Sequence, residues 1–290
     1  MGRDWLHGEG TVRERDRRTS RAASSCALWP DSTDSQNRRT AGSVLSLTCT
    51  GKKSGSYFSC SSGAMAVEPP TAEVHRSAAM YIGMRDLMNQ HGAHAITINC
   101  LGGFYSGQMV AYPCLGFSQL NSDGFVGACE ADMKSALTML SMSHLIGRPG
   151  YISDPVIDTS KNQIIYAHCV AMTRVDGPKG MPNPYQIRTH SEDRKGASMR
   201  SLLPLGRMTT TIQFDPVRKQ ILLHQGKSVA NIDEDRACRT KLAVEVKGDI
   251  DKLLNFWDQW GWHRVTFYGD LKQPVQALAG SLGYKVIEEA

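Results

Sequence analysis

The feature of this chain that most restricts its fold is a series of strand-like segments between residues 183 and 230. Three short stretches, Tyr185–His190, Met208–Phe214 and Gln220–His224, are rich in β-branched and apolar residues. Turns such as Asp215–Pro216 separate them. Short strands joined by turns are typical of antiparallel sheets. The series therefore predicts an antiparallel meander or a small β-barrel in this part of the chain.

The segment ahead of this series alternates helix and strand instead. Apolar spacing predicts a helix from Ala72 to about Gln90, which Gly92 ends. Ala95–Cys100 then reads as a short buried strand, and Ala128 to about Leu145 as a second helix. A helix followed by a strand favours an α/β layer with a parallel sheet.

The Gly-rich stretch Leu101–Asp123 is expected to be a long packed loop between these elements. It contains no GxGxxG or GxxxxGK[ST] pattern, so nothing supports nucleotide binding. Later in the chain, Gln163–Met172 is so apolar that it predicts a strand buried on both faces. The remaining predicted elements are two strands and two helices followed by a last strand: Lys241–Val246, Asp249–Gln259, Val265–Tyr268, Pro274–Leu282 and Lys285–Glu288.

The fold class predicted from these patterns is α/β followed by a small antiparallel barrel-like domain. Residues 1–64 are expected to be a disordered basic tail, residues 65–160 an α/β portion that carries a carboxylate pair, and residues 161–290 a C-terminal domain with the barrel and closing helices. The tail holds ten Lys and Arg against six Asp and Glu, so it accounts for most of the net charge of +5. The nearly neutral remainder argues against nucleic acid as a partner, although the tail alone leaves a nucleic-acid-binding alternative open.

Composition also limits the compartment. No run of about 18 apolar residues is present, which argues against a membrane partner. The eight cysteines form no CxxC pair, so a zinc ribbon is not expected. Cys100, Cys129 and Cys169 lie in apolar runs, where a buried free thiol is the expected state. We therefore expect a reducing, cytoplasmic location.

Two carboxylates on separate predicted elements are the candidate site residues. Glu130 lies near the predicted start of the second helix, and Asp154 ends the extended run that begins at Tyr151. Each has a simpler explanation, because Glu130 could complement the helix N-terminus and Asp154, before Pro155, could cap a turn. Together with later histidines, however, two such carboxylates can build a divalent-metal site.

Three histidines are candidates to complete the site. His168 lies inside the predicted buried strand, where a histidine with satisfied hydrogen bonds is the alternative. His263 stands just ahead of the strand Val265–Tyr268, where a surface histidine is the alternative. His190 opens the polar cluster that ends at Lys195, which could orient sugar hydroxyls or form a solvated turn. No GxSxG motif supports a nucleophilic serine.

From about Glu68 onward, several short motifs occur in an order that resembles the C-terminal half of the L-fucose isomerase/L-arabinose isomerase superfamily, in particular its L-fucose isomerase-related members. The motifs that carry this resemblance are Ala95-Ile-Thr-Ile-Asn-Cys-Leu101, Gly127-Ala-Cys-Glu-Ala-Asp132, Ile152-Ser-Asp-Pro155, Ala167-His-Cys169 and Gly261-Trp-His-Arg-Val-Thr-Phe267. They span about 220 of the 290 residues.

The resemblance implies a metal-dependent ketol-isomerase that interconverts aldoses and ketoses through an enediol. It implies Mn²⁺, or another divalent metal, held by Glu130, Asp154 and His263, with Glu130 and Asp154 sharing acid and base duties. His168 resembles a further active-site histidine, and His190 is a candidate for substrate binding. The implied partners are a monosaccharide substrate and further copies of the chain in a homo-oligomer.

The chain departs from this superfamily at its N-terminus. Full-length members carry two α/β domains ahead of the matching region, and residues 1–64 resemble neither. The resemblance therefore implies a chain truncated at the N-terminus, which holds the metal ligands without the whole pocket. This leaves an alternative function open, a catalytically silent module that binds carbohydrate or oligomerises.

Overall fold

The computed structural model describes residues 64–290, so all but the last residue of the predicted tail lie outside it. The helices of this part of the chain are α3 (Thr71–Gln90), α4 (Cys100–Tyr105), α5 (Cys114–Ser122), α6 (Met133–Ile146), α7 (Ile250–Phe256) and α8 (Lys272–Leu282), with single 3-10 turns η2 (Thr159–Lys161) and η3 (Trp257–Trp260). Its strands are β1 (Ala64–Val67), β2 (Ala95–Thr97), β3 (Val126–Ala128), β4 (Tyr151–Asp158), β5 (Gln163–His168), β6 (Tyr185–Arg188), β7 (Ser198–Ser201), β8 (Met208–Asp215), β9 (Gln220–Asn231), β10 (Thr240–Lys247), β11 (Arg264–Tyr268) and β12 (Lys285–Glu288).

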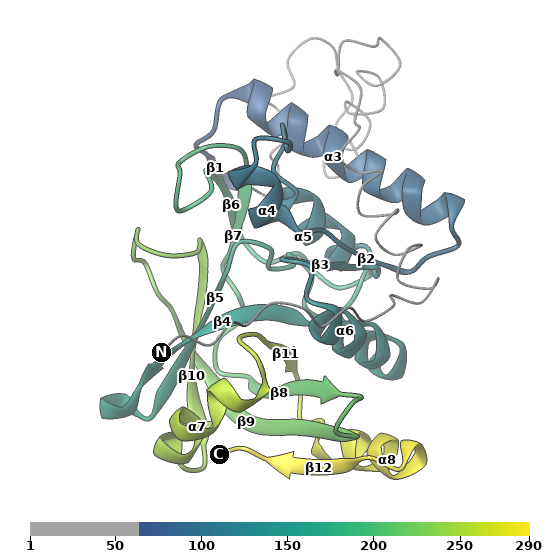
Figure 1. The fold of residues 1–290 in the computed structure, drawn as a ribbon. Coiled ribbons are helices and arrows are strands. Elements are labelled where there is room, and N and C mark those ends of the chain that lie inside the picture. Colours follow the sequence, from purple (N-terminus) through teal and green to yellow (C-terminus); the bar gives the residue numbers. More distant parts are fainter. Residues whose placement is uncertain (1–63) are drawn as a thin grey trace, which may run out of the picture.

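Six strands form a closed antiparallel barrel, which confirms a barrel in this part of the chain, but of the three predicted stretches only Met208–Phe214 and Gln220–His224 belong to it, whereas Tyr185–His190 contributes β6 to a separate sheet. Their order is β10-β5-β4-β11-β8-β9, and β9 pairs back with β10 to close the ring. Figure 1 shows this barrel in the lower half of the molecule, with β12 added beside β9 in parallel. Closure leaves no free sheet edge among these six strands.

The strand β4 links the barrel to the segment before it. It pairs with β5 on one side and with β11 on the other, so its hydrogen bonds belong to the barrel. The predicted domain boundary at residue 160 had assigned this strand to the α/β portion.

Within β4, Asp154 lies in the middle of the strand, opposite Ala167 of β5. The interpretation of Asp154 as a turn cap was therefore wrong.

The α/β portion contains a parallel pair, β2 and β3, as the helix–strand alternation predicted. The expected loop Leu101–Asp123 was wrong, because it contains two helices. The Asn99 side chain accepts a hydrogen bond from the backbone N–H of Gly102 and so caps α4. Pro113 directly precedes α5. Caps at these positions outweigh the glycines that favoured a loop.

The second predicted helix begins later than expected. Residues Val126–Ala128 form β3, and α6 starts only at Met133. Asp132 is its N-cap, and Gly147 ends it in the left-handed conformation, with φ at 67°. Glu130 consequently lies in the loop between β3 and α6, and the interpretation that it belongs to a helix start was wrong.

One apolar core joins the helices to the outside of the barrel. It contains Phe117 of α5, Met139 of α6, Ile212 of β8, and Val265 and Phe267 of β11. On β11 the alternate residues face the other way, since Tyr268 belongs to a second cluster with Tyr166. This packing holds the β3–α6 loop against the barrel mouth.

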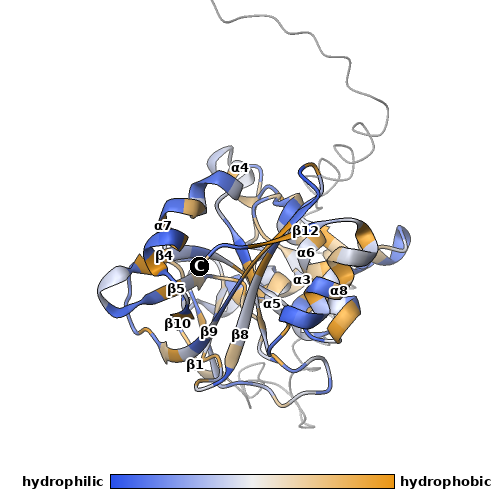
Figure 2. Ribbon diagram, turned by 90° about the horizontal axis from the view of Figure 1, so that it is seen from below, coloured by the Kyte–Doolittle hydropathy of each residue, from blue (hydrophilic) through white to orange (hydrophobic). Residues whose placement is uncertain are grey.

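The outer elements complete the shell. Strands β1, β6 and β7 form a separate small sheet, in which β1 and β6 run parallel. Figure 2 shows that α8 carries both hydrophobic and hydrophilic residues, and its buried members are Val275 and Ala279. Across residues 64–290, no helix combines the length and hydropathy that a membrane span requires.

Candidate functional site

A pocket of about 370 Å³ lies where the α/β portion meets the barrel. Glu130 enters it from the β3–α6 loop, Asp154 from β4 and His168 from the end of β5. Trp262, which is 63% exposed, lines its rim. The volume falls in the lower part of the range usual for small-molecule sites, roughly 300–1,000 Å³.

His263 does not line this pocket itself, but its ring reaches the two carboxylates that do. His263 Nε2 lies 3.4 Å from Glu130 Oε2 and 3.2 Å from Asp154 Oδ1. His168 Nε2 approaches the same two carboxylates from another side, at 3.7 Å from Glu130 Oε1 and 3.9 Å from Asp154 Oδ2. Four side chains that are distant in sequence therefore surround one small volume.

The backbone that presents Glu130 is strained. Glu130 and Ala131 have φ angles of 61° and 55°, in the left-handed region that residues other than glycine seldom adopt. The Ala131 N–H donates to Ile98 O at 2.9 Å, which helps to hold the loop. Each such residue costs on the order of 1–3 kcal/mol, and strain of this kind gathers at functional sites.

Asp132 determines the orientation of His263. Its carboxylate accepts bonds from the Ser135 N–H at 2.9 Å and the Ser135 hydroxyl at 2.6 Å, so the α6 cap anchors it. Its Oδ2 lies 3.0 Å from His263 Nδ1. A carboxylate accepts only, so Nδ1 carries the proton and donates. The three surrounding carboxylates keep a second proton on the ring, and a cation bound at Nε2 would replace that proton while Asp132 held the ring in place, the usual arrangement of a metal-binding histidine.

His168 has the opposite arrangement. The Cys169 N–H donates to His168 Nδ1 at 2.9 Å, so this nitrogen is the acceptor. The neutral ring of His168 therefore carries its proton on Nε2. This side chain is 2% exposed, and its Nε2 has no hydrogen-bond partner within the described part of the chain. His168 is thus built to donate a proton or hydrogen bond into the pocket.

The site is electrostatically unbalanced in favour of negative charge. Burial alone lowers the pKa of His263, but the carboxylates of Asp132, Asp154 and Glu130 outweigh burial and raise it to about 11. The close approach of His263 lowers the pKa of Glu130. Burial raises the pKa of Asp154, yet His263 and His168 bring it below its usual value. All these carboxylates are therefore ionised at neutral pH and favour a cation between them.

His190, Ser191 and Glu192 line the pocket wall, and the later members of this polar cluster face solvent. The His190 ring packs 5.9 Å from Phe104 and 5.5 Å from Tyr112, measured between centroids. The cluster members after Ser191, from Glu192 to Lys195, are exposed. The segment is therefore a largely exposed turn whose first three residues reach the pocket, and a role in orienting sugar hydroxyls stays a prediction.

Two expectations about histidines were wrong. His263 is not a surface residue, because only 6% of it is exposed. His168 is buried, but its Nε2 is not satisfied as in an ordinary core histidine. Sequence reasoning gave Asp132 little weight, although it orients His263. The N-cap pattern Asp132-x-x-Ser135 was the available signal.

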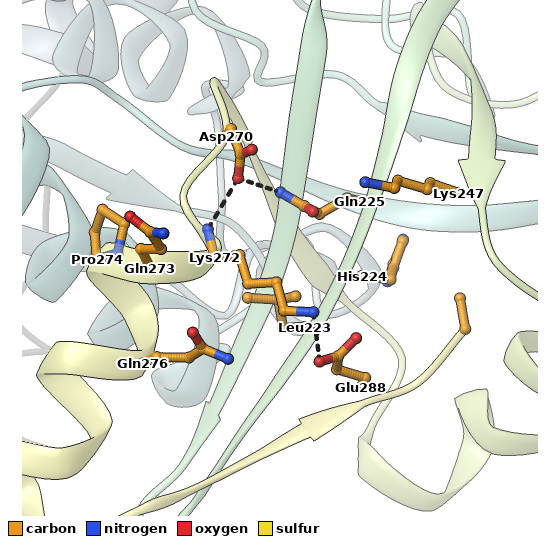
Figure 3. Close-up of a pocket in the computed structure, with 11 residues that line it drawn as sticks. Leu223, His224, Gln225, Lys247, Asp270, Lys272, Gln273, Pro274, Gln276 and Glu288 are labelled. Atoms are coloured by element: carbon orange, nitrogen blue, oxygen red, sulfur yellow. Dashed lines mark hydrogen bonds and ion pairs between the residues drawn. The ribbon is translucent and has the colours of Figure 1, made fainter.

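A second, larger cavity of about 530 Å³ lies beside α8 and β12 and is drawn in Figure 3. Its charged groups are mostly paired with one another. Lys272 Nζ meets Glu288 at 2.7 Å, and Asp270 accepts from Gln225 at 2.8 Å. It brings together no group of acids and histidines comparable to that around Glu130, so it is a weaker candidate for chemistry.

The comparisons with known proteins point to sugar isomerases. The chain is 26% identical over 216 residues to a sulfoquinovose isomerase from Clostridium sp. (strain MSTE9), a match that covers 70% of this chain and 46% of that protein. It is 31% identical over 225 residues to a sulfoquinovose isomerase from Alkalicoccus urumqiensis, covering 75% of this chain and 49% of that protein. The chain thus spans about half the length of the curated relatives it matches. No protein-family model matches it.

Proposed function

We propose that this chain is the metal-binding half of an aldose–ketose isomerase, and that it belongs to the L-fucose/L-arabinose isomerase type predicted from its motifs. The observation that carries the proposal is that His263 Nε2 lies within 3.4 Å of a carboxylate oxygen of both Glu130 and Asp154. The two sulfoquinovose isomerases support the reaction class.

The donor set fits a Mn²⁺-class cation. Two ionised carboxylates and one imidazole are the ligand types that suit Mn²⁺. His263 Nε2 is buried and without a hydrogen-bond partner among residues 64–290, and Asp132 would hold the tautomer that frees its lone pair once a cation displaces the Nε2 proton. When bound by Glu130, Asp154 and His263, the cation would supply positive charge beside the oxygens of the sugar.

The residues themselves then divide the proton chemistry. Aldose–ketose isomerisation moves a proton between C1 and C2 of the sugar through an enediol. Glu130 and Asp154, both with pKa values below the usual range, are ionised and able to take the proton. His168 donates its Nε2–H to the sugar oxygen on which negative charge develops. His190 forms part of the wall against which the sugar packs.

Sulfoquinovose is the first substrate to test, because both relatives are named for it. The pocket opens past the half-exposed Val156 and the exposed Trp262, so a further surface would be needed to enclose a sugar. We propose that other copies of the chain, or the protein part that the relatives have in addition, supply this surface.

The alternative is a module that binds sugar or assembles without turnover. The pocket's open rim favours it. Both functions predict that the folded chain binds a divalent cation if Glu130, Asp154 and His263 are ligands, but only the first predicts conversion of an aldose into a ketose.

The test is calorimetric titration of the purified chain with Mn²⁺, followed by nuclear magnetic resonance of sulfoquinovose incubated with the loaded protein. We expect binding of one ion and formation of the ketose. Glu130→Gln removes one ligand charge and is expected to weaken Mn²⁺ binding by more than ~100-fold, beyond the cost of losing an outer-shell partner.

Asp158→Asn is the matched control, because Asp158 ends the same strand as Asp154 and bonds only locally to Ser160. It should leave Mn²⁺ affinity unchanged. If the wild-type chain binds no divalent ion, the proposed function is abandoned. Mn²⁺ binding without conversion of the sugar would support the silent module. This outcome should hold for the chain alone and for the chain mixed with the region of its relatives that lies outside the match.

A further inference from the structure

The pocket wall opposite His263 is unusually rich in thiols. Cys100, Cys114, Cys129, Cys169 and Cys238 all line it. The proposed isomerisation uses none of them, since it needs only carboxylates, imidazoles and a hard cation. Cys100 and Cys129 are in contact, with their sulfurs 3.4 Å apart and only 2% and 3% of the two residues exposed. Cys169 and Cys238 form a second hydrogen-bonded pair.

This pair lies directly beside Glu130. Cys129 precedes Glu130 in the chain, and ligand atoms of Cys129, Glu130 and His168 all lie within 4.8 Å of one another. Thiolates bind Zn²⁺ at about 2.3 Å, which places two sulfurs of one tetrahedral ion roughly 3.8 Å apart. The observed 3.4 Å separation between the two sulfurs needs only a small widening.

We propose that Cys100, Cys129 and Glu130 form a second cation site that takes a thiophilic divalent ion such as Zn²⁺ or Cd²⁺. Soft thiolate ligands select these ions over Mn²⁺, whereas the carboxylate–imidazole set around His263 suits Mn²⁺. Nothing in the proposed isomerisation assigns the two cysteines a role.

His168 is excluded as a fourth ligand of this site. The Cys169 N–H points at its Nδ1, so its Nε2 holds a proton and has no lone pair for a cation. The fourth position therefore stays open to water. This assignment separates the thiol site from the site at His263, where the tautomer is the reverse.

The two sites share Glu130, so they exclude each other. A soft ion that pulls the Glu130 carboxylate toward Cys129 removes a ligand from the Mn²⁺ set. This sharing rests on the proposed function, but thiolate binding does not. A thiophilic ion would therefore act as an inhibitor that competes with the activating cation.

The experiment titrates the chain with Cd²⁺ in the absence of Mn²⁺, under a phosphine reductant. The readout is the ultraviolet charge-transfer band that only thiolate-bound cadmium gives. The background protein carries serine at the three cysteines that lie outside the described residues: Cys26, Cys49 and Cys60. We expect a saturable band at one ion per chain.

Cys100→Ala and Cys129→Ala should each weaken Cd²⁺ binding by at least ~10-fold, since even an outer-shell loss costs about that much. Cys238→Ala, which removes a thiol from the same pocket, and His168→Gln should leave it unchanged. Two alanine variants are used so that one that fails to fold does not decide the outcome. A band that survives both, or that disappears in Cys238→Ala, overturns the proposal.

A competition titration tests the sharing. Saturating Cd²⁺ should raise the apparent Kd for Mn²⁺ by at least ~10-fold in the wild-type chain, and much less in Cys100→Ala. A cadmium band in a protein that binds no Mn²⁺ would end the proposed function and leave the thiol site standing. Mn²⁺ binding without any cadmium band would overturn the thiol site and leave the proposed function standing.

Discussion

His263 and Arg264 are neighbours at the start of β11, but they belong to two buried charged clusters that differ in charge balance. Arg264 and Glu289 are both fully buried, and the guanidinium meets the carboxylate at 3.1–3.2 Å. Backbone oxygens of Trp257, Gly261 and His263 accept its other N–H groups. We call this group, with His224 and Tyr166, the Arg264 cluster.

The Arg264 cluster is balanced and continuous. His224 Nδ1 lies 2.9 Å from Glu289 Oε1, and His224 Nε2 meets the Tyr166 hydroxyl. Tyr166 in turn accepts from the Thr211 hydroxyl at 2.9 Å. Each charge thus has partners within the protein. At the His263 site, by contrast, carboxylates exceed cations and two imidazole nitrogens have no hydrogen-bond partner among residues 64–290.

The difference separates a cluster that stabilises the fold from one arranged to bind a ligand. In a buried ion pair with every hydrogen bond made, each charge is compensated by the other. Removing one partner leaves an uncompensated buried charge, which lowers the stability of the fold. A cluster with excess negative charge gains from an added cation instead. Substitutions should therefore affect stability at Arg264 and ligand binding at His263.

The largest expected effect breaks the Arg264 cluster. Glu289→Gln leaves Arg264 buried without its counter-charge and is expected to lower the free energy of unfolding by about 3–5 kcal/mol. Urea unfolding at neutral pH measures it. The matched control is Glu288→Gln, because Glu288 is exposed and pairs with Lys272 at the surface. That change should cost less than about 1 kcal/mol. Equal losses in both variants would contradict the comparison.

The pH dependence of that loss sharpens the comparison. Burial raises the pKa of Glu289, but His224 and Arg264 outweigh burial and hold it below the usual value. A lowered folded-state pKa gives stability that is complete above the unfolded value, about 4.3, and disappears as pH falls through the folded value. The gap between wild type and Glu289→Gln should therefore narrow below about pH 4. Unfolding curves at several acidic pH values measure this. A difference in the free energy of unfolding between wild type and Glu289→Gln that stays constant with pH would contradict the prediction.

The smallest expected effect concerns the His263 site. Asp132→Asn removes the charge that orients His263 but keeps a good N-cap for α6. We expect Mn²⁺ affinity to fall about 10–100-fold with little loss of stability. Calorimetry with a thermal melt measures both. A large drop in melting temperature with unchanged Mn²⁺ affinity would place Asp132 with the stabilising residues instead.

Local patterns predicted much of the fold. The helix at Thr71–Gln90 and the strands at Met208–Asp215 and Lys285–Glu288 begin and end within a residue or so of their predicted limits. The regular spacing of their apolar residues is enough to predict them without knowing what they pack against. Weak local signals failed elsewhere. Strand β3 has three residues, and α4 contains two glycines, so only their packing and caps define them.

The candidate site was predictable in its members but not in their roles. Glu130, Asp154, His168 and His263 were all named from motifs, and the structure places the first three in one pocket with His263 beside both carboxylates. Motifs contain no information on which ring nitrogen carries the proton. That depends on Asp132 Oδ2 for His263 and on the Cys169 N–H for His168. The pairing of Arg264 with Glu289 was likewise outside any sequence pattern.

The amino-acid sequence by itself determined the strongly periodic helices and strands, such as Thr71–Gln90 and Met208–Asp215, and which residues carry charge, because these properties depend on neighbours a few positions away. Only the tertiary structure decided that β4 joins the barrel and that Asp132 faces His263. It also decided that Cys100 lies against Cys129. These contacts link residues far apart in the chain, and the closure of the barrel and the shared apolar core bring them together.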